Sequence, residues 1–409
     1  MLLPPDIEFR LTGSPWPECG RDCRSPIKIL CFVPSLGGGG AEMHLVRLLN
    51  HFDRGEFELS LAVARGGGSY EPMLRDELSA RRCGWDWIPS STLRMRSAIG
   101  GLRQMIERER PSVVLAFLDH AVAATAKALS GLTYLRPPFI AGIQNNLEKA
   151  IEHLPGWSKR WLGPNILSAY ARADHVIALS TGVANSLVKL VPPVQCRVTV
   201  VHNAGYDSDV ERLSRQEPEQ PVPKGDWFLA CGRLTAQKDF ATLLRAFAKV
   251  KNDVGGELWI LGEGEQRRNL ERDISKLGLS GRVNLPGFVK NPFAFMARAS
   301  AFVLSSRWEG FGNVLTEAMA CGTPIISTDC PYGPREILED GKWGELVPVG
   351  DAEVLGNALR SSVRDWKRLC ARAEAAHEYV TRFEASGITK QYEAVIRSVL
   401  AARKSRYES

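Results

Sequence analysis

The chain has 409 residues, 44% of them hydrophobic and 24% charged, with a formal net charge of +6. This length predicts two to three globular domains, and basic and acidic side chains are spread evenly along the chain, which argues against a nucleic-acid-binding half. The nine cysteines form no Cys-x2-Cys pair and have no histidine at ligand spacing, so neither a zinc site nor a disulfide framework is expected.

No targeting or spanning segment is predicted. The first 25 residues lack the continuous apolar stretch of a signal peptide, and no run of 18 apolar residues occurs anywhere. We expect a cytoplasmic protein, or one that lies on the inner face of the cytoplasmic membrane.

Short apolar or β-branched runs alternate with helix-length segments, which is typical of a doubly wound parallel sheet. In the first half the predicted strands are 27–36, 57–64, 112–119, 139–146, 175–180 and 198–203, with helices that include 41–51 and 121–129. A proline-rich, charged stretch at 217–225 then indicates a linker. A second series follows, with predicted strands at 227–234, 257–263, 283–288, 301–306, 324–328 and 345–349.

The fold class is therefore α/β, with two Rossmann-like doubly wound domains. The predicted domains are an N-terminal extension at 1–25, a first domain at 26–208, a linker at 209–225, a second domain at 226–380 and a C-terminal segment at 381–409.

A glycine run separates the first predicted strand from the first predicted helix. It contains Gly39 and Gly40 and is followed by Glu42. Glycines let the backbone approach a ligand closely, and a bare helix N-terminus attracts anions. The run is not a dinucleotide-binding fingerprint, because no acidic residue ends the second strand. A tight turn is the alternative.

Two later strand ends in the first domain carry polar residues. His120 follows the third strand, where it can face a ligand, although a lone histidine is as often a packing residue. Asn145 and Asn146 end the fourth strand and can hydrogen-bond hydroxyl groups of a ligand, but paired asparagines are also ordinary turn residues.

Two cations flank the first turn of the second domain. Arg233 leaves the end of a predicted strand and Lys238 opens the next predicted helix, so both can converge on one diphosphate. Arginine suits bidentate phosphate contact and lysine acts as a movable point charge. A solvated surface pair is the alternative.

Two carboxylates separated by seven residues are the most informative feature. Glu309 follows a buried strand, and Glu317 lies on a helix predicted to run through Ala320 with Asn313 as its cap. Each carboxylate can bind a pair of hydroxyls while the helix start faces a phosphate. Solvated carboxylates beside a helix start are the alternative.

These motifs resemble the group 1 retaining glycosyltransferases, which are GT4-like enzymes of GT-B fold. The resemblance rests on Gly-Gly-Ala-Glu at 39–42, Gly-Arg-Leu with Gln-Lys at 232–238, Glu-Gly-Phe-Gly-Asn at 309–313 and Gly-Pro-Arg-Glu-Ile at 333–337. It covers about residues 27–400. It implies a cleft between two Rossmann-like domains and a last helix that crosses back to the first domain.

The resemblance also implies residue roles. Catalytic roles fall on His120, Arg233, Lys238 and Glu309. Acceptor-side roles fall on Glu42, Asn145 and Asn146. Donor-binding roles fall on Gly39, Gly40, Gly232, Gly264, Phe288, Val289, Gly310, Phe311, Gly312, Asn313, Val314, Leu315 and Glu317.

The implied activity is retaining transfer of a hexosyl or N-acetylhexosaminyl group from a nucleoside diphosphate sugar, with UDP favoured, to a glycan or lipid-linked acceptor. Bacterial polysaccharide and oligosaccharide enzymes are the members it resembles. No cofactor and no nucleic acid partner is expected. The alternatives are a non-catalytic sugar-nucleotide-binding or scaffold protein on the same fold, and a related epimerase or phosphorylase.

Two further patterns bear on metal and membrane binding. Asp207 and Asp209 have the spacing that metal-dependent glycosyltransferases use, but they lie in the interdomain connection, so no metal is expected. Segment 154–170 mixes aromatic and basic residues (Trp157, Lys159, Arg160 and Trp161), which suits an anionic membrane surface. A surface helix packed on the first domain would show the same pattern.

Overall fold

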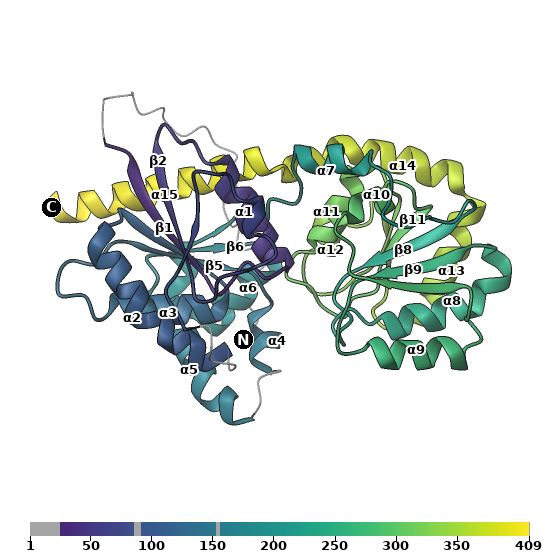
Figure 1. Ribbon diagram of the computed structural model, residues 1–409, viewed down its shortest axis with the longest axis horizontal. Coiled ribbons are helices and arrows are strands. Elements are labelled where there is room, and N and C mark those ends of the chain that lie inside the picture. Colours follow the sequence, from purple (N-terminus) through teal and green to yellow (C-terminus); the bar gives the residue numbers. More distant parts are fainter. Residues whose placement is uncertain (1–24, 86–90, 153–155, 409) are drawn as a thin grey trace, which may run out of the picture. The chain divides into compact units, whose positions relative to one another are not determined.

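The computed structural model describes residues 25–85, 91–152 and 156–408 (Figure 1). They form two compact units. The N-terminal unit contains the described residues up to Ala204 together with the helix that begins at Ala385, and the C-terminal unit is Gly205–Glu384.

The N-terminal unit is built on a seven-stranded sheet in the order β3-β2-β1-β4-β5-β6-β7, and all pairings are parallel. The strands are β1 Ile27–Val33, β2 Phe57–Val63, β3 Ala80–Arg82, β4 Val113–Phe117, β5 Phe139–Ile143, β6 His175–Ala178 and β7 Val198–Val200. The central strands β4 and β5 have continuous apolar sequences and are fully buried, as strands covered on both faces are. Strand order reverses between β1 and β4, and ligands bind at the carboxyl ends of the strands beside such a reversal.

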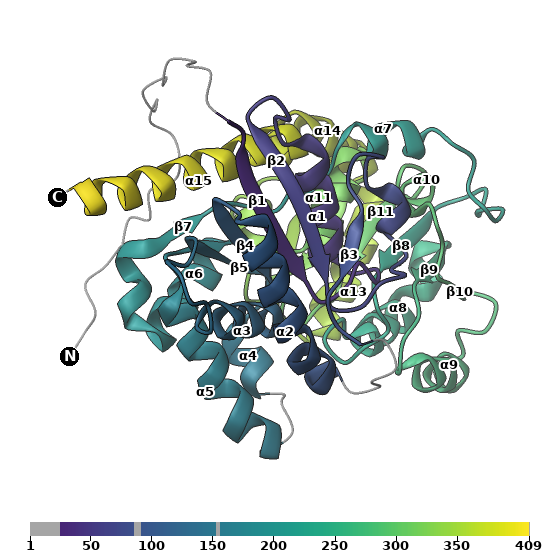
Figure 2. The same ribbon diagram turned by 60° about the vertical axis from the view of Figure 1, so that its left-hand side comes forward.

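Helices cover this sheet. They are α1 Gly40–His51, α2 Ser91–Glu109, α3 Asp119–Leu129, α4 Leu147–Glu152, α5 Gly156–Arg172, α6 Thr181–Leu190 and α15 Ala385–Glu408, with 3-10 turns η1 Glu71–Met73 and η2 Pro192–Arg197. The long C-terminal helix α15 packs against α1 (Figure 2). The Asp53 amide donates to Glu393 of α15 at 2.9 Å. The last helix is therefore part of the N-terminal unit, although it follows the C-terminal unit in sequence.

A buried histidine joins α1, α15 and the end of the first sheet. The Ala204 amide donates to Nδ1 of His44 at 2.8 Å, so Nε2 carries the proton and donates to the Tyr392 hydroxyl at 3.1 Å. Burial lowers the pKa of His44 to about 3. Burial likewise lowers the pKa of His175 to about 4, where the ring contacts the Thr199 hydroxyl at 2.8 Å. Both rings are therefore neutral near pH 7.

The C-terminal unit has a six-stranded parallel sheet in the order β10-β9-β8-β11-β12-β13. The strands are β8 Trp227–Cys231, β9 Glu257–Leu261, β10 Val283–Gly287, β11 Ala301–Leu304, β12 Ile325–Thr328 and β13 Glu345–Val347. The helices are α7 Ser208–Ser214, α8 Phe240–Val254, α9 Arg267–Lys276, α10 Pro292–Met296, α11 Asn313–Ala320, α12 Pro334–Ile337, α13 Ala352–Arg364 and α14 Trp366–Tyr379, with the 3-10 turn η3 Val380–Phe383. Here strand order reverses between β8 and β11.

The unit boundaries fall at different residues from those we placed. The first unit ends at Ala204 rather than at residue 208, and the crossing back occurs at Ala385 rather than at 381. The expected linker at 209–225 lies inside the C-terminal unit and begins with most of α7. Its Glu219 carboxylate accepts hydrogen bonds from the backbone amides of Lys290 and Asn291. The extension at 1–25 lies outside the described residues but for its last residue.

Membrane-spanning helices are absent from the described part of the chain, since none of its helices is long and apolar enough to cross a bilayer.

Candidate functional site

The functional candidates of the C-terminal unit gather where its strand order reverses. β8 ends at Cys231, next to the loop that carries Arg233 and Lys238, and β11 ends at Leu304, before the loop that carries Glu309. The neighbouring strands β8 and β11 are marked in Figure 1. The two strands are parallel neighbours, so both loops begin at the carboxyl ends of the strands, on the same side of the sheet.

Lys238 and Glu309 are in direct contact. Nζ of Lys238 lies 2.6 Å from Oε1 of Glu309, and the Ser306 hydroxyl donates to the same oxygen at 2.6 Å. The Glu309 residue is 6% exposed and the Lys238 side chain 16% exposed. We predicted that Lys238 opens the helix, but α8 begins at Phe240, so Lys238 lies in the preceding loop. The interpretation of Lys238 as part of a solvated pair does not fit this burial.

The two neighbours of Lys238 hold its loop in place. The Gln237 carbonyl accepts from the Arg307 amide at 2.8 Å, and its side chain donates to the Trp308 carbonyl at 2.9 Å. On the other side of Lys238, the buried Asp239 pairs with Nε of Arg307 at 3.0 Å. These contacts of Gln237 and Asp239 with Arg307 and Trp308, which we call the brace, hold the Lys238 loop against the segment that leads to Glu309.

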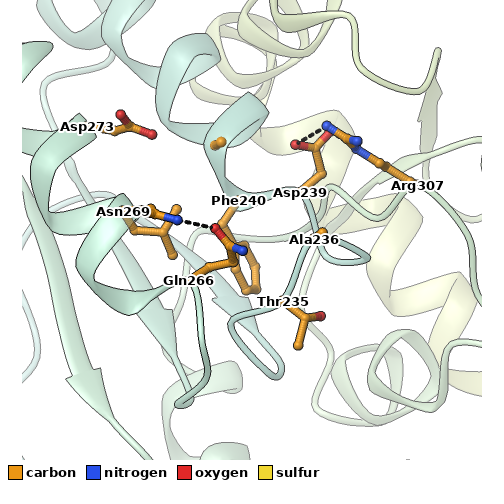
Figure 3. A pocket seen from close by; sticks show the side chains of 10 residues that line it. Thr235, Ala236, Asp239, Phe240, Gln266, Asn269, Asp273 and Arg307 are labelled. Atoms are coloured by element: carbon orange, nitrogen blue, oxygen red, sulfur yellow. Dashed lines mark hydrogen bonds and ion pairs between the residues drawn. The ribbon is translucent and has the colours of Figure 1, made fainter. Parts of the chain in front are cut away.

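A hollow of about 140 Å³ lies beside this brace (Figure 3). Its lining includes the Asp239–Arg307 pair and polar residues of α9, among them Asn269 and Asp273. Arg233, Lys238, Glu309 and Glu317 do not line it. We therefore treat it as a feature of the brace and not as the donor pocket.

Close packing explains why glycine stands at two of the candidate positions, Gly232 and Gly264. A methyl group at Gly232 would lie 3.0 Å from Cε of Lys238, so the lysine stem crosses the backbone there. A Cβ at Gly264 would lie 2.4 Å from the Leu234 carbonyl oxygen, where the loops after β8 and β9 are hydrogen-bonded. Gly264 thus keeps two loops in contact, a structural role that the sequence did not indicate.

Arg233 differs from Lys238 in its surroundings. Its residue is exposed, and none of the residues that the structure describes forms a hydrogen bond or ion pair with its guanidinium. It can therefore contact an anion without first losing a protein partner.

Glu317 lies on α11, near the end of β8. Burial raises the pKa of the Cys231 thiol to about 12, and the charge of Glu317 raises it further while Lys238 opposes this. Glu309 adds to the effect of burial on Cys330, whose pKa is also raised to about 12. These raised pKa values keep both thiols protonated near pH 7, which makes them poor nucleophiles.

The loop before α11 ends in a glycine that forms the helix N-cap. We predicted Asn313 as the helix cap, and this is wrong: Gly312 takes that position with φ of +101°, and Asn313 is the first helical residue. Phe311 packs edge-on against Phe383 at 5.5 Å, and Leu315 is buried. The side chains of Phe311 and Leu315 therefore belong to the core, whereas Gly310 and the Val314 side chain are only partly covered.

The loop after β10 presents an aromatic ring to solvent. Phe288 is 65% exposed, whereas the adjacent Val289 is buried. Of these two predicted donor-binding residues, only Phe288 exposes its side chain.

In the N-terminal unit, His120 is the second residue of α3 and is half-buried beside Asp119. Burial raises the pKa of Asp119, while hydrogen bonds from Tyr170, at 2.8 Å, and from Asn145 act against this shift. Asn145 is exposed, but Asn146 is buried and its side chain accepts from the Lys149 amide at 3.0 Å. Asn146 therefore caps α4, the turn role that was our alternative.

The glycine run precedes α1 as predicted. Gly39 is the N-cap and Gly40 the first helical residue. A Cβ at Gly39 would lie 2.4 Å from Oε2 of Glu42, so the carboxylate folds back over the start of the helix. A larger residue at position 39 would make this flexible carboxylate shift.

Two candidate site residues were not identified from the sequence. Ser306 directly precedes the Glu309 motif, but nothing in the pattern showed that its hydroxyl points at the carboxylate. Gln144 follows β5 and is 5% exposed, and neither polar atom of its side chain has a partner among the described residues. Its place next to Asn145 was the only available signal.

The metal and membrane candidates complete the survey. No three His, Cys, Asp or Glu side chains gather as a cation site in residues 25–85, 91–152 or 156–408. Asp207 caps α7, and Asp209 pairs with Arg212 at 2.9 Å. α5 contains most of the 154–170 segment, but the side chains of Trp157, Lys159, Arg160 and Trp161 lie outside the described set.

Comparison with solved structures supports the fold. The chain is similar to Anabaena HepE, solved in complex with UDP and glucose, with a TM-score of 0.76 and 21% identity over 91% of this chain and 100% of that one. It is also similar to sucrose-phosphate synthase of Thermosynechococcus elongatus, with a TM-score of 0.76 and 18% identity over 92% of this chain and 99% of that one. The two-domain Rossmann-like GT-B fold class is thereby confirmed.

Sequence comparison gives the family. The model of Glycosyltransferase Family 4 matches residues 38–205, and that of Glycosyl transferases group 1 matches residues 214–379. The chain is 34% identical to an N-acetylgalactosaminyltransferase of Campylobacter jejuni that acts on a diphospho-undecaprenol-linked sugar, over 83% of this chain and 91% of that protein. It is 28% identical to the lipopolysaccharide core biosynthesis glycosyltransferase LpsE of Rhizobium meliloti, over 87% of this chain and 94% of that protein. The chain therefore belongs to the group 1, GT4-like glycosyltransferases, as its motifs predicted.

Proposed function

We propose that this glycosyltransferase moves a sugar from a UDP-linked donor to a glycan or lipid-linked acceptor, with retention of configuration and without a metal. The buried contact between Lys238 and Glu309 carries the proposal. It places a cation that can bind a diphosphate beside a carboxylate that can bind sugar hydroxyls. In a nucleoside diphosphate sugar the diphosphate and the sugar hydroxyls are likewise neighbours.

The donor assignment has two further supports. The exposed ring of Phe288 can stack on a base, and Anabaena HepE, which has the same fold, was solved in complex with UDP and glucose and with UDP-glucose. A lipid-linked acceptor is suggested by the Campylobacter relative, whose name specifies a diphospho-undecaprenol substrate. A hexosyl or N-acetylhexosaminyl group fits both relatives.

The proposed chemistry is direct substitution on one face of the sugar. The bond from the anomeric carbon to the diphosphate oxygen breaks, the acceptor oxygen bonds to the same face, and the acceptor proton passes to the departing phosphate. Arg233 and Lys238 stabilise the charge that grows on the leaving diphosphate, which is the work a metal does elsewhere. Glu309 orients the sugar and Glu317 the ribose. In the N-terminal unit, His120, Glu42 and Asn145 are the proposed contacts of the reacting sugar and the acceptor.

A panel of nucleoside diphosphate sugars tests the donor assignment. A ligand that binds only the folded protein raises the melting temperature, so UDP-sugars should give the largest rise. NMR of the product of the best donor should show the donor's anomeric configuration. An inverted product would contradict the retaining mechanism, and donor binding without any transfer would favour the non-catalytic alternative.

Peripheral membrane attachment is the proposed localisation, on the inner face of the cytoplasmic membrane. Flotation with anionic vesicles tests it. Binding that weakens with salt and in Lys159→Glu/Arg160→Glu supports it, whereas no binding at low salt contradicts it.

A further inference from the structure

The cation proposed for the diphosphate already has a counterion inside the protein. Oε1 of Glu309 accepts both from Nζ of Lys238 and from the Ser306 hydroxyl, each at 2.6 Å. The two side chains are 16% and 8% exposed, so water screens their charges weakly. Any anion that binds Lys238 must therefore share it with this carboxylate or displace it.

The carboxylate is the fixed partner of this pair. The Glu309 amide donates to the Pro331 carbonyl at 2.7 Å, and its carbonyl accepts from the Tyr332 amide at 3.1 Å. With Ser306 fully buried and bonded to the side chain, Glu309 is held at three points. The ammonium of Lys238 ends a flexible four-carbon stem, so the lysine is the partner that can turn away.

We propose that Glu309 competes with the diphosphate for Lys238, and that this competition lets the enzyme hold the intact donor and release the free nucleoside diphosphate. The inference rests on the proposed function. An intact donor brings sugar hydroxyls that can donate to Glu309 when Lys238 turns to the phosphates. Free UDP brings none there, so binding it leaves a buried carboxylate without its cation, which is unfavourable.

Calorimetric titration with UDP measures the competition. Glu309→Gln removes the charge but keeps the shape of the side chain, so UDP should bind about tenfold more tightly than to the wild type, as expected for uncoupling one close charge pair. Glu353→Gln is the matched control, because Glu353 contacts Lys249 at the same 2.6 Å on the exposed surface of the same unit. The control should leave UDP affinity unchanged.

A double-mutant cycle separates competition for Lys238 from plain repulsion of the diphosphate. In a Lys238→Ala background, Glu309→Gln should give little or no gain, because the contested cation is gone. A tenfold gain that persists in this background would mean that Glu309 repels UDP directly, and the proposal would be overturned.

The remaining outcomes are equally decisive. Equal or weaker UDP binding by Glu309→Gln overturns this inference and leaves the proposed function standing. UDP that binds neither the wild type nor Glu309→Gln overturns both. If Glu309→Gln melts well below the wild type, Glu309→Asp gives the second measurement: its shorter carboxylate withdraws from Lys238, so UDP should still tighten, by a smaller factor.

Discussion

Nε of Arg307 lies 3.0 Å from the carboxylate of Asp239, the residue that follows Lys238. This pair and the Gln237–Trp308 bond hold the Lys238 loop from both sides. Lys238 and Glu309 are 71 residues apart in sequence, and their contact depends on this brace.

We therefore expect Arg307→Ala to lower turnover by about tenfold, because a misplaced charge-stabilising contact costs rate. Although the Arg307 side chain is about half exposed, its partner Asp239 is buried and would lose its cation, so the variant should also lose roughly 3 kcal/mol of stability. Turnover is therefore measured at a temperature where the variant stays folded. Arg360→Ala, which removes the pair with Asp253 at 2.8 Å, is the matched control and should retain full turnover. Equal turnover in both variants would show that the brace does not contribute to catalysis.

Alanine variants of the two proposed phosphate-binding cations should both lose turnover, but only one of them should also lose thermal stability. Arg233→Ala and Lys238→Ala should each lower turnover about 10- to 1000-fold. The guanidinium of Arg233 has no partner among the described residues, so its variant should melt like the wild type. Lys238→Ala leaves Glu309 buried without a cation, so it should lose roughly 3 kcal/mol of stability. Near-normal turnover in both variants would exclude these cations from the mechanism.

Activity should survive chelation, since Arg233 and Lys238 are proposed to stabilise the diphosphate charge in place of a metal. Turnover is compared before and after excess EDTA. Complete loss with EDTA that manganese or magnesium restores would overturn this assignment.

The N-terminal unit should lose stability in mild acid. His44 has a pKa of about 3 when folded and about 6.5 when unfolded, so below pH 6.5 the unfolded chain takes up a proton that the folded one does not. The stabilisation is complete above pH 6.5 and is lost as the pH falls toward 3, by about 1.4 kcal/mol per pH unit. His175 acts in the same sense down to about pH 4.

Denaturant unfolding between pH 7 and 4.5 measures this slope. His44→Gln, which has no group that titrates in this range, should flatten it, even though the variant is less stable at pH 7. A slope unchanged by His44→Gln would show that other groups control acid sensitivity.

The sequence predicted most of the sheet architecture and the main site motifs, because apolar runs and turn residues are local signals. The short edge strand β3 was not predicted, since Ala80–Arg82 contains only one apolar residue. The Asn313 cap was wrong because Gly312 takes the left-handed conformation there, which glycine adopts without strain. The Ser306 hydrogen bond and the burial of Lys238 could not be predicted, because both depend on loops that tertiary packing brings together.

Transfer itself tests the central claim most directly. UDP release is followed with a UDP-sugar, with and without lipid-diphosphate-linked sugar acceptors, for the wild type, Lys238→Ala and the surface control Lys249→Ala. We predict acceptor-dependent UDP release with a glycosylated product, retained by Lys249→Ala and reduced at least tenfold by Lys238→Ala. Donor binding by the wild type without any transfer, or equal transfer by Lys238→Ala and Lys249→Ala, would contradict it.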